Sequence, residues 1–546
     1  MGGFKAVEDR PTPKEVYNWR LYAEASIIAT GSKPTDSLFI PPRLTFPNSF
    51  GYDSAFIGTT IARNGFKRDF GITAENSNNI SSNITSAFQA GALGGALLCF
   101  FITERIGRKW TLQANVVIFL VGAILMTAAT NQLSYIYAGR ALTGIGCGGI
   151  TATVPSYIGE LSIPSIRGIL TGLFEVAYQV GSVVGFWINY GITQNINPAL
   201  AVSWRIPMGF QLVPAGILFV GCFFVHESPL WLLRKGRADE AYKVLETIRH
   251  LPIDDKYMQE EIDMMRKKMD EEAAVARGYG SGQWAYFRGV ASMLCRKGMR
   301  NRLALVFCAF ALNNLSGAAA INYYSPTLFA SIGITDVALY TGIYGLIKAI
   351  ASIVYFVFLI DLLGRRWPAI ASSFICSLCL WVVGSYVKIG HPADIIAAGK
   401  ELSASTAAGG KAATGMIMIY SICWSFGLNG IPWIVSAEIF PGALRNFTGT
   451  FAALCVWSTQ FAITKAMPYI FSSFGYGTWF FFAAWMIVAT LWAFFLLPET
   501  KGLTMDQMDV IFGYAHDSRP EPSTKVIDTA FDDSDKAKRS EHTEDV

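Results

Sequence analysis

The sequence predicts an all-helical membrane protein with twelve transmembrane segments arranged as two bundles of six helices. Three observations predict this class: an apolar composition, a series of apolar stretches long enough to span a bilayer, and charged loop motifs that recur in both halves of the chain. Of 546 residues, 52% are hydrophobic and only 15% are charged. A single soluble core cannot bury that much apolar surface.

Eleven stretches are each long enough to cross roughly 30 Å of hydrocarbon. Five lie near residues 80–102, 111–130, 134–157, 168–190 and 206–226, and six near 302–329, 338–361, 368–388, 413–436, 447–470 and 478–498. The remaining span comes first and is interrupted. Residues 21–30 and 50–62 are each too short to cross, and residues 31–49 between them carry four prolines and two cations. Joined directly, the two flanks make one span.

The chain therefore divides into five parts. These are a polar N-terminus (1–20), a first bundle (21–226), a polar segment with amphipathic helices (227–300), a second bundle (301–498) and a polar tail (499–546). The composition of the tail predicts disorder. Lys and Arg concentrate in the loops after the second, fourth, eighth and tenth spans, so these loops and both termini are expected in the cytoplasm.

The sequence gives little support for a nucleic-acid partner, a metal or cofactor site, or enzymatic catalysis. The formal net charge is only +4, so we expect no nucleic-acid partner. Cys376 and Cys379 lie inside an apolar span and are expected to be buried, so we expect no metal or cofactor. Gly144, Gly146 and Gly149 fit GxGxxG, but no strand precedes them, and glycines in a membrane helix permit close packing. There is no recognisable spacing of a nucleophile and a base, which argues against an enzyme.

The loops of the two halves repeat each other. ERIGRK (104–109) follows the second span, and DLLGRR (361–366) follows the eighth. Two related six-helix bundles suit alternating access around a site at the midplane. Charges in such loops can reflect the positive-inside bias alone, but acids and bases at matched spacing favour ion pairs that form a cytoplasmic gate. The predicted gate residues are Glu104, Arg105, Arg108, Glu160, Arg167, Asp361, Arg365, Arg366, Glu438 and Arg445.

Five further motifs carry a family resemblance: GRALTGIGCGG (139–149), PSYIGELSIPSIRG (155–168), NYYSP (322–326), IPWIVSAEIF (431–440) and LPETKGLT (497–504). They resemble signatures of the sugar porter family of the major facilitator superfamily, over a region from Tyr17 to Phe512. Residues 8–20 and 51–60 are similar to the fungal quinate permeases within that family. The resemblance implies the major facilitator fold and a monomeric, multi-pass transporter of the plasma membrane. Because the family's first span is continuous, residues 31–49 are expected to be translated intron, the alternative being a real loop.

Three charges stand out within the spans, where each costs about 2.5 to 3.5 kcal/mol on insertion scales. Asp53 and Arg140 match positions that the resemblance assigns to a proton relay, in which protonation of Asp53 releases Arg140. The alternative is a permanent structural ion pair. Lys348 stands where hexose carriers of the family have a neutral amide, so we expect it to bind the carboxylate of an organic acid. The alternative is a bond to a cavity acid or to backbone carbonyls.

The sugar-binding pattern of the family is only partly matched. Asn313 and Asn314 replace a Gln-Gln pair, and Ala319 replaces an asparagine, which should weaken binding of a neutral polyhydroxylated ring. The aromatic residues of the pattern could instead be lipid-facing bulk. The predicted substrate residues are Gln179, Asn313, Asn314, Lys348, Asn429, Trp433, Trp457 and Gln460.

One added cation and one lost amide favour quinate, a cyclic polyol carboxylate, over hexose. The function we expect is import of quinate with protons across the lipid bilayer. The alternatives are a hexose or polyol proton symporter of the same family, a non-transporting nutrient sensor, and a non-functional product of the interrupted first span.

Overall fold

A computed structural model describes residues 13–17, 19–30, 49–163, 167–276, 279, 283–334, 336–440, 444–501 and 505–513. Regular structure throughout these residues is helical. Helices suit the apolar spans because each one satisfies its backbone N–H and C=O groups internally, where a bilayer offers no water. The predicted all-helical class is confirmed.

The first half of the chain contains the following helices: η1 (Lys14–Val16), α1 (Trp19–Thr30), α2 (Ser49–Ile61), α3 (Asn64–Asp69), α4 (Ser77–Ile106), α5 (Arg108–Thr127), α6 (Leu133–Leu161), α7 (Arg167–Asn195), α8 (Val202–Phe210), α9 (Leu212–Gly221) and η3 (Cys222–Phe224). Four helices then form the polar connection: α10 (Pro229–Arg234), α11 (Ala238–Arg249), α12 (Lys256–Ala276) and α13 (Gln283–Leu294).

The second half contains α14 (Lys297–Asn314), α15 (Ala318–Ser331), α16 (Val337–Val354), the π-helical turn η4 (Tyr355–Leu359), α17 (Ile360–Leu363), α18 (Arg366–Gly390), α19 (Pro392–Ala397), α20 (Ala404–Phe426), α21 (Ile431–Ile439), α22 (Arg445–Phe474), α23 (Gly477–Phe495) and α24 (Met505–Ile511). Several of these helices combine into single spans, namely α14 with α15, α16 with η4 and α17, and α20 with α21.

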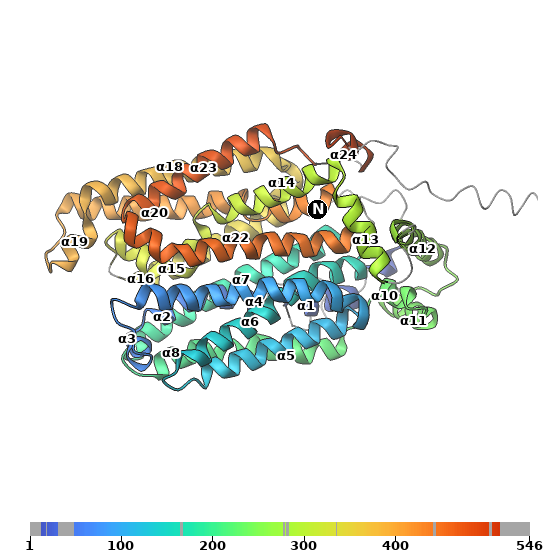
Figure 1. Cartoon of the computed structure of the whole chain (residues 1–546), viewed down its shortest axis with the longest axis horizontal. Helices are drawn as coiled ribbons and strands as arrows, with labels where there is room; N and C mark the ends of the chain where they lie inside the picture. Colours follow the sequence, from blue (N-terminus) through green and yellow to red (C-terminus); the bar gives the residue numbers. More distant parts are fainter. Residues whose placement is uncertain are drawn as a thin grey trace, which may run out of the picture.

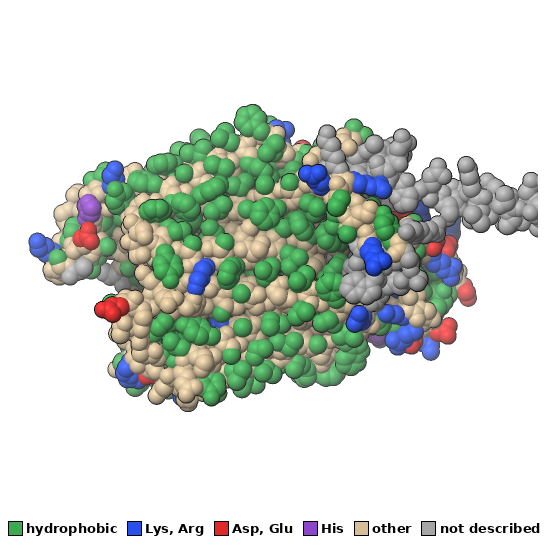
Figure 2. Space-filling view, in the orientation of Figure 1, with side chains coloured by type: hydrophobic (Ala, Val, Ile, Leu, Met, Phe, Trp, Pro, Cys, Tyr) green, Lys and Arg blue, Asp and Glu red, His purple; other side chains and the backbone are tan. Residues whose placement is uncertain are grey.

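The two halves lie one above the other in Figure 1, with α10–α13 gathered at one end and α3 and α19 at the opposite end. We call these the loop end and the far end. Figure 2 shows hydrophobic side chains over the middle of the visible face and charged side chains mainly at the two ends. Eight described segments are long and apolar enough to cross a membrane. With α6, α7, α22 and the α1–α2 pair, they make twelve spans.

The first span is divided between α1 and α2, which both pack along α7 but lie toward opposite ends of the molecule (Figure 1). They have 12 and 13 residues, so at about 1.5 Å per residue neither covers roughly 30 Å. Ile28 of α1 joins an apolar cluster with Leu170, whereas Phe56 of α2 joins one with Trp204. Residues 31–48, nearly the whole predicted insert, lie outside the described part of the chain.

Glycines allow α6 to approach its neighbours closely. A Cβ at Gly144 would lie 2.1 Å from the carbonyl oxygen of Phe88 on α4, and one at Gly149 would lie 2.1 Å from Oδ1 of Asn115 on α5. These glycines therefore serve helix packing, as expected for small residues in membrane helices.

Two spans of the second half are broken near their centres. Between α14 and α15, Gly317 adopts φ +94°, with the ring of Phe482 beside it. Between α20 and α21, a Cβ at Gly430 would clash with the ring of Phe356. Irregular backbone at membrane depth is tolerated where it is buried in protein or lines a polar site.

Deleting residues 31–49 should join α1 to the rest of α2 as one continuous helix along α7. We expect the shortened protein to reach the membrane and to have a Tm at least equal to that of the full chain, measured by thermal unfolding in detergent. Deletion of residues 50–62, which removes α2 itself, is the control and should abolish folded protein. If both deletions abolish it, residues 31–49 are an essential part of the fold.

Candidate functional site

An ion pair links α2 to α6 in the interior of the first half. Nη1 of Arg140 lies 2.7 and 2.8 Å from the two carboxylate oxygens of Asp53, and both side chains are completely buried. The guanidinium also donates through Nε to the carbonyl of Ile84 at 3.3 Å and lies 4.5 Å from the ring centre of Phe88. Two of the three charges that the sequence singled out therefore neutralise each other.

Lys348 lies on α16 and is 1% exposed. Its ammonium lies 5.0 Å from the ring centre of Trp424 and 5.7 Å from that of Tyr178, so aromatic rings of both halves surround it. Its polar contact with the amide oxygen of Asn322 is long, at 3.5 Å. An ammonium has three donors, and this one has a single weak acceptor among the described residues. The site is therefore suited to receiving an anionic oxygen.

A second charge, Glu175, lies on α7. We call Lys348 and Glu175, together with their neighbours Tyr178, Trp424, Asn322, Gln179 and Asn429, the central cluster. Oε1 of Glu175 accepts from Nε2 of Gln179 at 2.7 Å and from Nδ2 of Asn429 at 3.1 Å. Asn429, from the break between α20 and α21, also donates to Oγ of Ser352 at 3.2 Å. The carboxylate and the Lys348 ammonium attract one another electrostatically. Within the described residues, however, neither forms an ion pair shorter than 4 Å.

The remaining predicted amides make contacts inside the second half. Asn313 donates to a backbone carbonyl at the break between α20 and α21. Asn314 donates to Oγ1 of Thr459 at 2.8 Å, which ties α14 to α22. Gln460 donates to the hydroxyl of Tyr323 at 3.3 Å. The structure thus brings Gln179 and Asn429 together around Glu175. Asn313 instead bonds to the break between α20 and α21, and Asn314 bonds to α22.

The two predicted tryptophans face protein. Trp457 donates from Nε1 to Oγ1 of Thr151 at 3.1 Å and packs edge-on against Phe88, so it joins α22 to the first half. Trp433 packs edge-on against Phe310, with ring centres 5.0 Å apart.

At the far end, the two halves touch directly. The hydroxyls of Thr85 on α4 and Tyr324 on α15 lie 2.7 Å apart, and Oγ of Ser82 donates to the carbonyl of Lys465 on α22 at 2.9 Å. These contacts join α4 of the first half to α15 and α22 of the second half.

At the loop end, three of the five predicted gate residues of the first half, Glu104, Arg108 and Glu160, form one network. Arg108 at the start of α5 pairs with Glu104 and with Glu160, each at 2.9 Å. The hydroxyl of Ser228 donates to Oε2 of Glu160, the same oxygen that lies 2.9 Å from Nε of Arg108, while Oε1 accepts from Nη2 of Arg108 at 3.0 Å. The carboxylate of Glu227 accepts from the backbone N–H of Arg108 at 2.8 Å and so caps α5. These bonds join helices of the same half.

The second half repeats this arrangement. Arg365 pairs with Glu438 at 2.8 Å, and Thr500 donates to the other oxygen of Glu438. The carboxylate of Glu499 accepts from the backbone N–H of Arg365 at 2.9 Å. Each half thus has an arginine paired with an acid that also accepts from a hydroxyl, and another acid that accepts from the backbone N–H of that arginine. The internal repeat inferred from the loops is therefore present in three dimensions.

The two capping acids differ in proton affinity. Burial raises the pKa of Glu227, although backbone N–H groups, including those of Ser228 and Lys109, favour its ionised form. Glu499 is less buried, and the backbone N–H of Arg365 helps to lower its pKa despite the opposing effect of burial. The cap of the first half therefore takes up a proton more readily.

Five other gate residues were predicted from the sequence. Arg105 is exposed at the end of α4. Arg366 donates to a backbone carbonyl of α23 at 2.6 Å. The side chains of Arg167, Asp361 and Arg445 lie outside the described residues.

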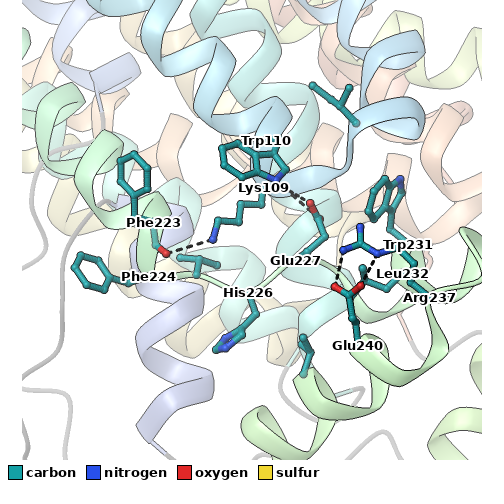
Figure 3. A pocket seen from close by; sticks show the side chains of 13 residues that line it. Lys109, Trp110, Phe223, Phe224, His226, Glu227, Trp231, Leu232, Arg237 and Glu240 are labelled. Atoms are coloured by element: carbon teal, nitrogen blue, oxygen red, sulfur yellow. Dashed lines mark hydrogen bonds and ion pairs between the residues drawn. The ribbon is translucent and has the colours of Figure 1, made fainter.

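A surface pocket of about 410 Å³ lies beside the first-half network at the loop end (Figure 3). The ammonium of Lys109 donates to the carbonyl of Phe223 at 3.2 Å, and Arg237 pairs with Glu240. The residues that line the pocket are Ile106, Lys109, Trp110, Phe223, Phe224, Val225, His226, Glu227, Trp231, Leu232, Arg237, Glu240 and Val244. The central residues around Lys348 are not among them.

Comparison with known proteins fits this architecture. The model of the family described as "Sugar (and other) transporter" matches residues 45–512. The chain belongs to this family. It is 40% identical over 514 residues to a probable quinate permease of Aspergillus clavatus, covering 93% of this chain and 90% of the relative. It is 39% identical over 511 residues to the quinate permease of Emericella nidulans, covering 93% and 91%.

Solved structures show the same fold. The proton:xylose symporter XylE bound to 6-bromo-6-deoxy-D-glucose has a TM-score of 0.70 at 19% identity, covering 90% of this chain and 99% of that chain. A partially occluded inward-open XylE from E. coli has a TM-score of 0.68 at 19% identity, covering 90% and 100%. The twelve-helix major facilitator fold is thereby confirmed. The protein is a multi-pass membrane transporter for a small molecule and not an enzyme.

Glu175 is the central residue that sequence reasoning missed. It lies within the predicted span 168–190, one helical turn before Gln179, so both side chains share a face of α7. An acid at membrane depth was itself the available signal. Tyr178 and Trp424 gave no such signal, because aromatic residues are frequent in all the spans.

Replacing Asp53 by Asn should leave the buried Arg140 charge without a partner. Removing one member of a buried ion pair typically costs about 3–5 kcal/mol. We therefore expect a clear fall in Tm for Asp53→Asn and recovery of most of it in Asp53→Asn/Arg140→Met. The exposed acid variant Glu240→Gln is the control and should leave Tm unchanged. An equally low Tm for the single and double variants would contradict a net stabilising role for charge pairing.

Proposed function

We propose that this transporter imports quinate together with protons across the plasma membrane. Support comes from the similar proteins named quinate permeases and from the fold shared with a structure named as a proton:xylose symporter. In this proposal the loop end and both termini are cytoplasmic, in keeping with the cationic loops. The protein works as a monomer that rocks its two halves around the central cluster.

The observation that carries the proposal is that the Lys348 ammonium has fewer hydrogen-bond acceptors than donors among the described residues. Its buried ammonium has aromatic faces around it and one distant amide oxygen, but no carboxylate in contact among the described residues. Charge-assisted hydrogen bonds are about twice as strong as neutral ones. The carboxylate of quinate supplies such a partner, and Gln179, Asn429 and Gln460 are the amides proposed to bind its hydroxyl groups. Trp433 and Trp457 shape the walls through protein contacts.

Proton coupling is assigned to Asp53 and Arg140. The bidentate contact between them holds α2 against α6. A proton on Asp53 removes the charge that binds Arg140, so the attachment between the two helices weakens. Protonation therefore gives the first half a second arrangement, as alternating access requires. The networks at Arg108 and Arg365 are proposed to form the cytoplasmic gate.

A hexose or polyol carrier of the same family is the second candidate. The amides Gln179, Asn429 and Gln460 bind neutral hydroxyl groups as readily as those of quinate, and this observation favours it. The two candidates differ only in their use of the Lys348 charge.

Lys348→Asn should separate them. We expect quinate uptake in yeast without its own carrier to fall at least thirty-fold, equivalent to about 2 kcal/mol of lost binding. Any uptake of a neutral sugar or polyol should remain within about threefold. The exposed variant Lys388→Asn is the control and should leave uptake unchanged. Undiminished quinate uptake by Lys348→Asn would contradict the anion site.

Charge counting gives a further prediction. One proton moving with one quinate anion carries no net charge, so uptake is driven by the pH gradient, at about 1.4 kcal/mol per pH unit. Depolarising the membrane at fixed pH should therefore leave the uptake rate nearly unchanged. A second proton would add roughly 2.3 kcal/mol per 100 mV. Strong slowing on depolarisation would rule out one-to-one coupling.

A further inference from the structure

We propose that Glu175 is an internal substitute for the substrate carboxylate, neutralising Lys348 whenever the site is empty. This inference rests on the proposed function, because it explains how a transporter with a buried cation can complete its cycle. It assigns Glu175 to the return of the empty transporter, a step separate from the proton relay at Asp53.

The geometry places Glu175 beside Lys348 without an ion pair between them. The carboxylate is restrained by an amide from each half, Gln179 at 2.7 Å and Asn429 at 3.1 Å. Lys348 is restrained on α16, which packs against α7 along the boundary of the two halves. Asn429 donates both to Glu175 and to Ser352, which lies one helical turn after Lys348 on α16, so the two charges lie in the same region. A substrate carboxylate can therefore reach the ammonium without first breaking a tight internal ion pair.

Electrostatics makes the substitution necessary. An unpaired charge at membrane depth is costly, so a central site with Lys348 alone would resist reorientation when empty. Glu175 gives the empty site a net charge of zero. When quinate binds, its carboxylate becomes the direct partner of Lys348, and the proton on Asp53 balances the added negative charge. Both the empty and the loaded forms are then neutral.

The second contact of Glu175 links it to the movement of the halves. Asn429 belongs to the second half and Glu175 to the first, so their hydrogen bond must break or change as the halves rock. Asn429 retains Ser352 as a partner within its own half. The bond is therefore a contact between the halves that can be released without leaving Asn429 unpaired.

Comparison of net uptake with exchange tests the proposal. Net uptake requires return of the empty transporter, whereas exchange of labelled external quinate for unlabelled internal quinate does not. In Glu175→Gln we expect net uptake to fall at least tenfold while exchange stays within threefold of the wild type. Glu175→Asp, which keeps the charge, should restore most net uptake. Glu75→Gln, at an exposed acid between α3 and α4, is the matched control and should change neither rate.

The outcomes separate this inference from the proposed function. Absence of both modes in the wild type would overturn the proposed function itself. Equal loss of both modes in Glu175→Gln, with normal wild-type transport and normal surface amount, would overturn only the inference. Net uptake by Glu175→Gln at the wild-type rate would overturn it as well.

A second measurement applies if Glu175→Gln does not reach the surface. Lys348→Met leaves Glu175 without its opposite charge, so removing that acid too should be stabilising. We expect Glu175→Gln/Lys348→Met to have a higher Tm than Lys348→Met alone, which is a double-mutant test of coupling. A double variant with a Tm equal to or below that of Lys348→Met would contradict the charge pairing.

Discussion

The central site depends on how the protein stabilises one cation, Lys348, at membrane depth. No single group neutralises it at close range among the described residues. The aromatic faces of Tyr178 and Trp424, the amide oxygen of Asn322 and the more distant carboxylate of Glu175 share this task. Such distributed stabilisation leaves the ammonium without a carboxylate in direct contact among the described residues, as the proposed anion site requires. The broken spans of the second half supply part of this environment, since Asn429 comes from the break between α20 and α21.

The networks at the loop end give each half a rigid base. Arg108 with Glu160 and Arg365 with Glu438 each connect helices of one half, and Glu227 and Glu499 cap α5 and α18. Because the bonds lie within the halves, the halves can change their mutual angle while each keeps its own packing. Flexibility is then concentrated at contacts between them, such as Thr85 with Tyr324 and Glu175 with Asn429.

Much of the fold and part of the candidate site could be predicted from the sequence. Hydrophobic length located the spans, because the bilayer fixes how many apolar residues a helix needs. Lone charges in those spans identified Asp53, Arg140 and Lys348, and the loop repeat identified Arg108 and Arg365 together with Glu160 and Glu438. These are local signals. The energetic cost of a charge within a span and the spacing of a motif can both be recognised without knowing which helices are neighbours.

What could not be predicted depends on helix orientation and on breaks in the backbone. Asn313 and Asn314 are adjacent in sequence, yet one contacts the break between α20 and α21 and the other contacts α22. Gly317, with its positive φ, precedes α15 directly, and the sequence does not show that the span breaks there. The charge of Glu175 could be recognised in the sequence, but its neighbours Lys348 and Asn429, which are 173 and 254 residues away along the chain, could not.

The most direct test of the central claim is calorimetric titration of the purified transporter with quinate and with its methyl ester, which keeps the ring and the hydroxyl groups but lacks the charge. If Lys348 binds the substrate carboxylate, the wild type should bind the ester at least tenfold more weakly than the acid, and Lys348→Met should bind the two equally. Equal affinity of the wild type for acid and ester would contradict the account.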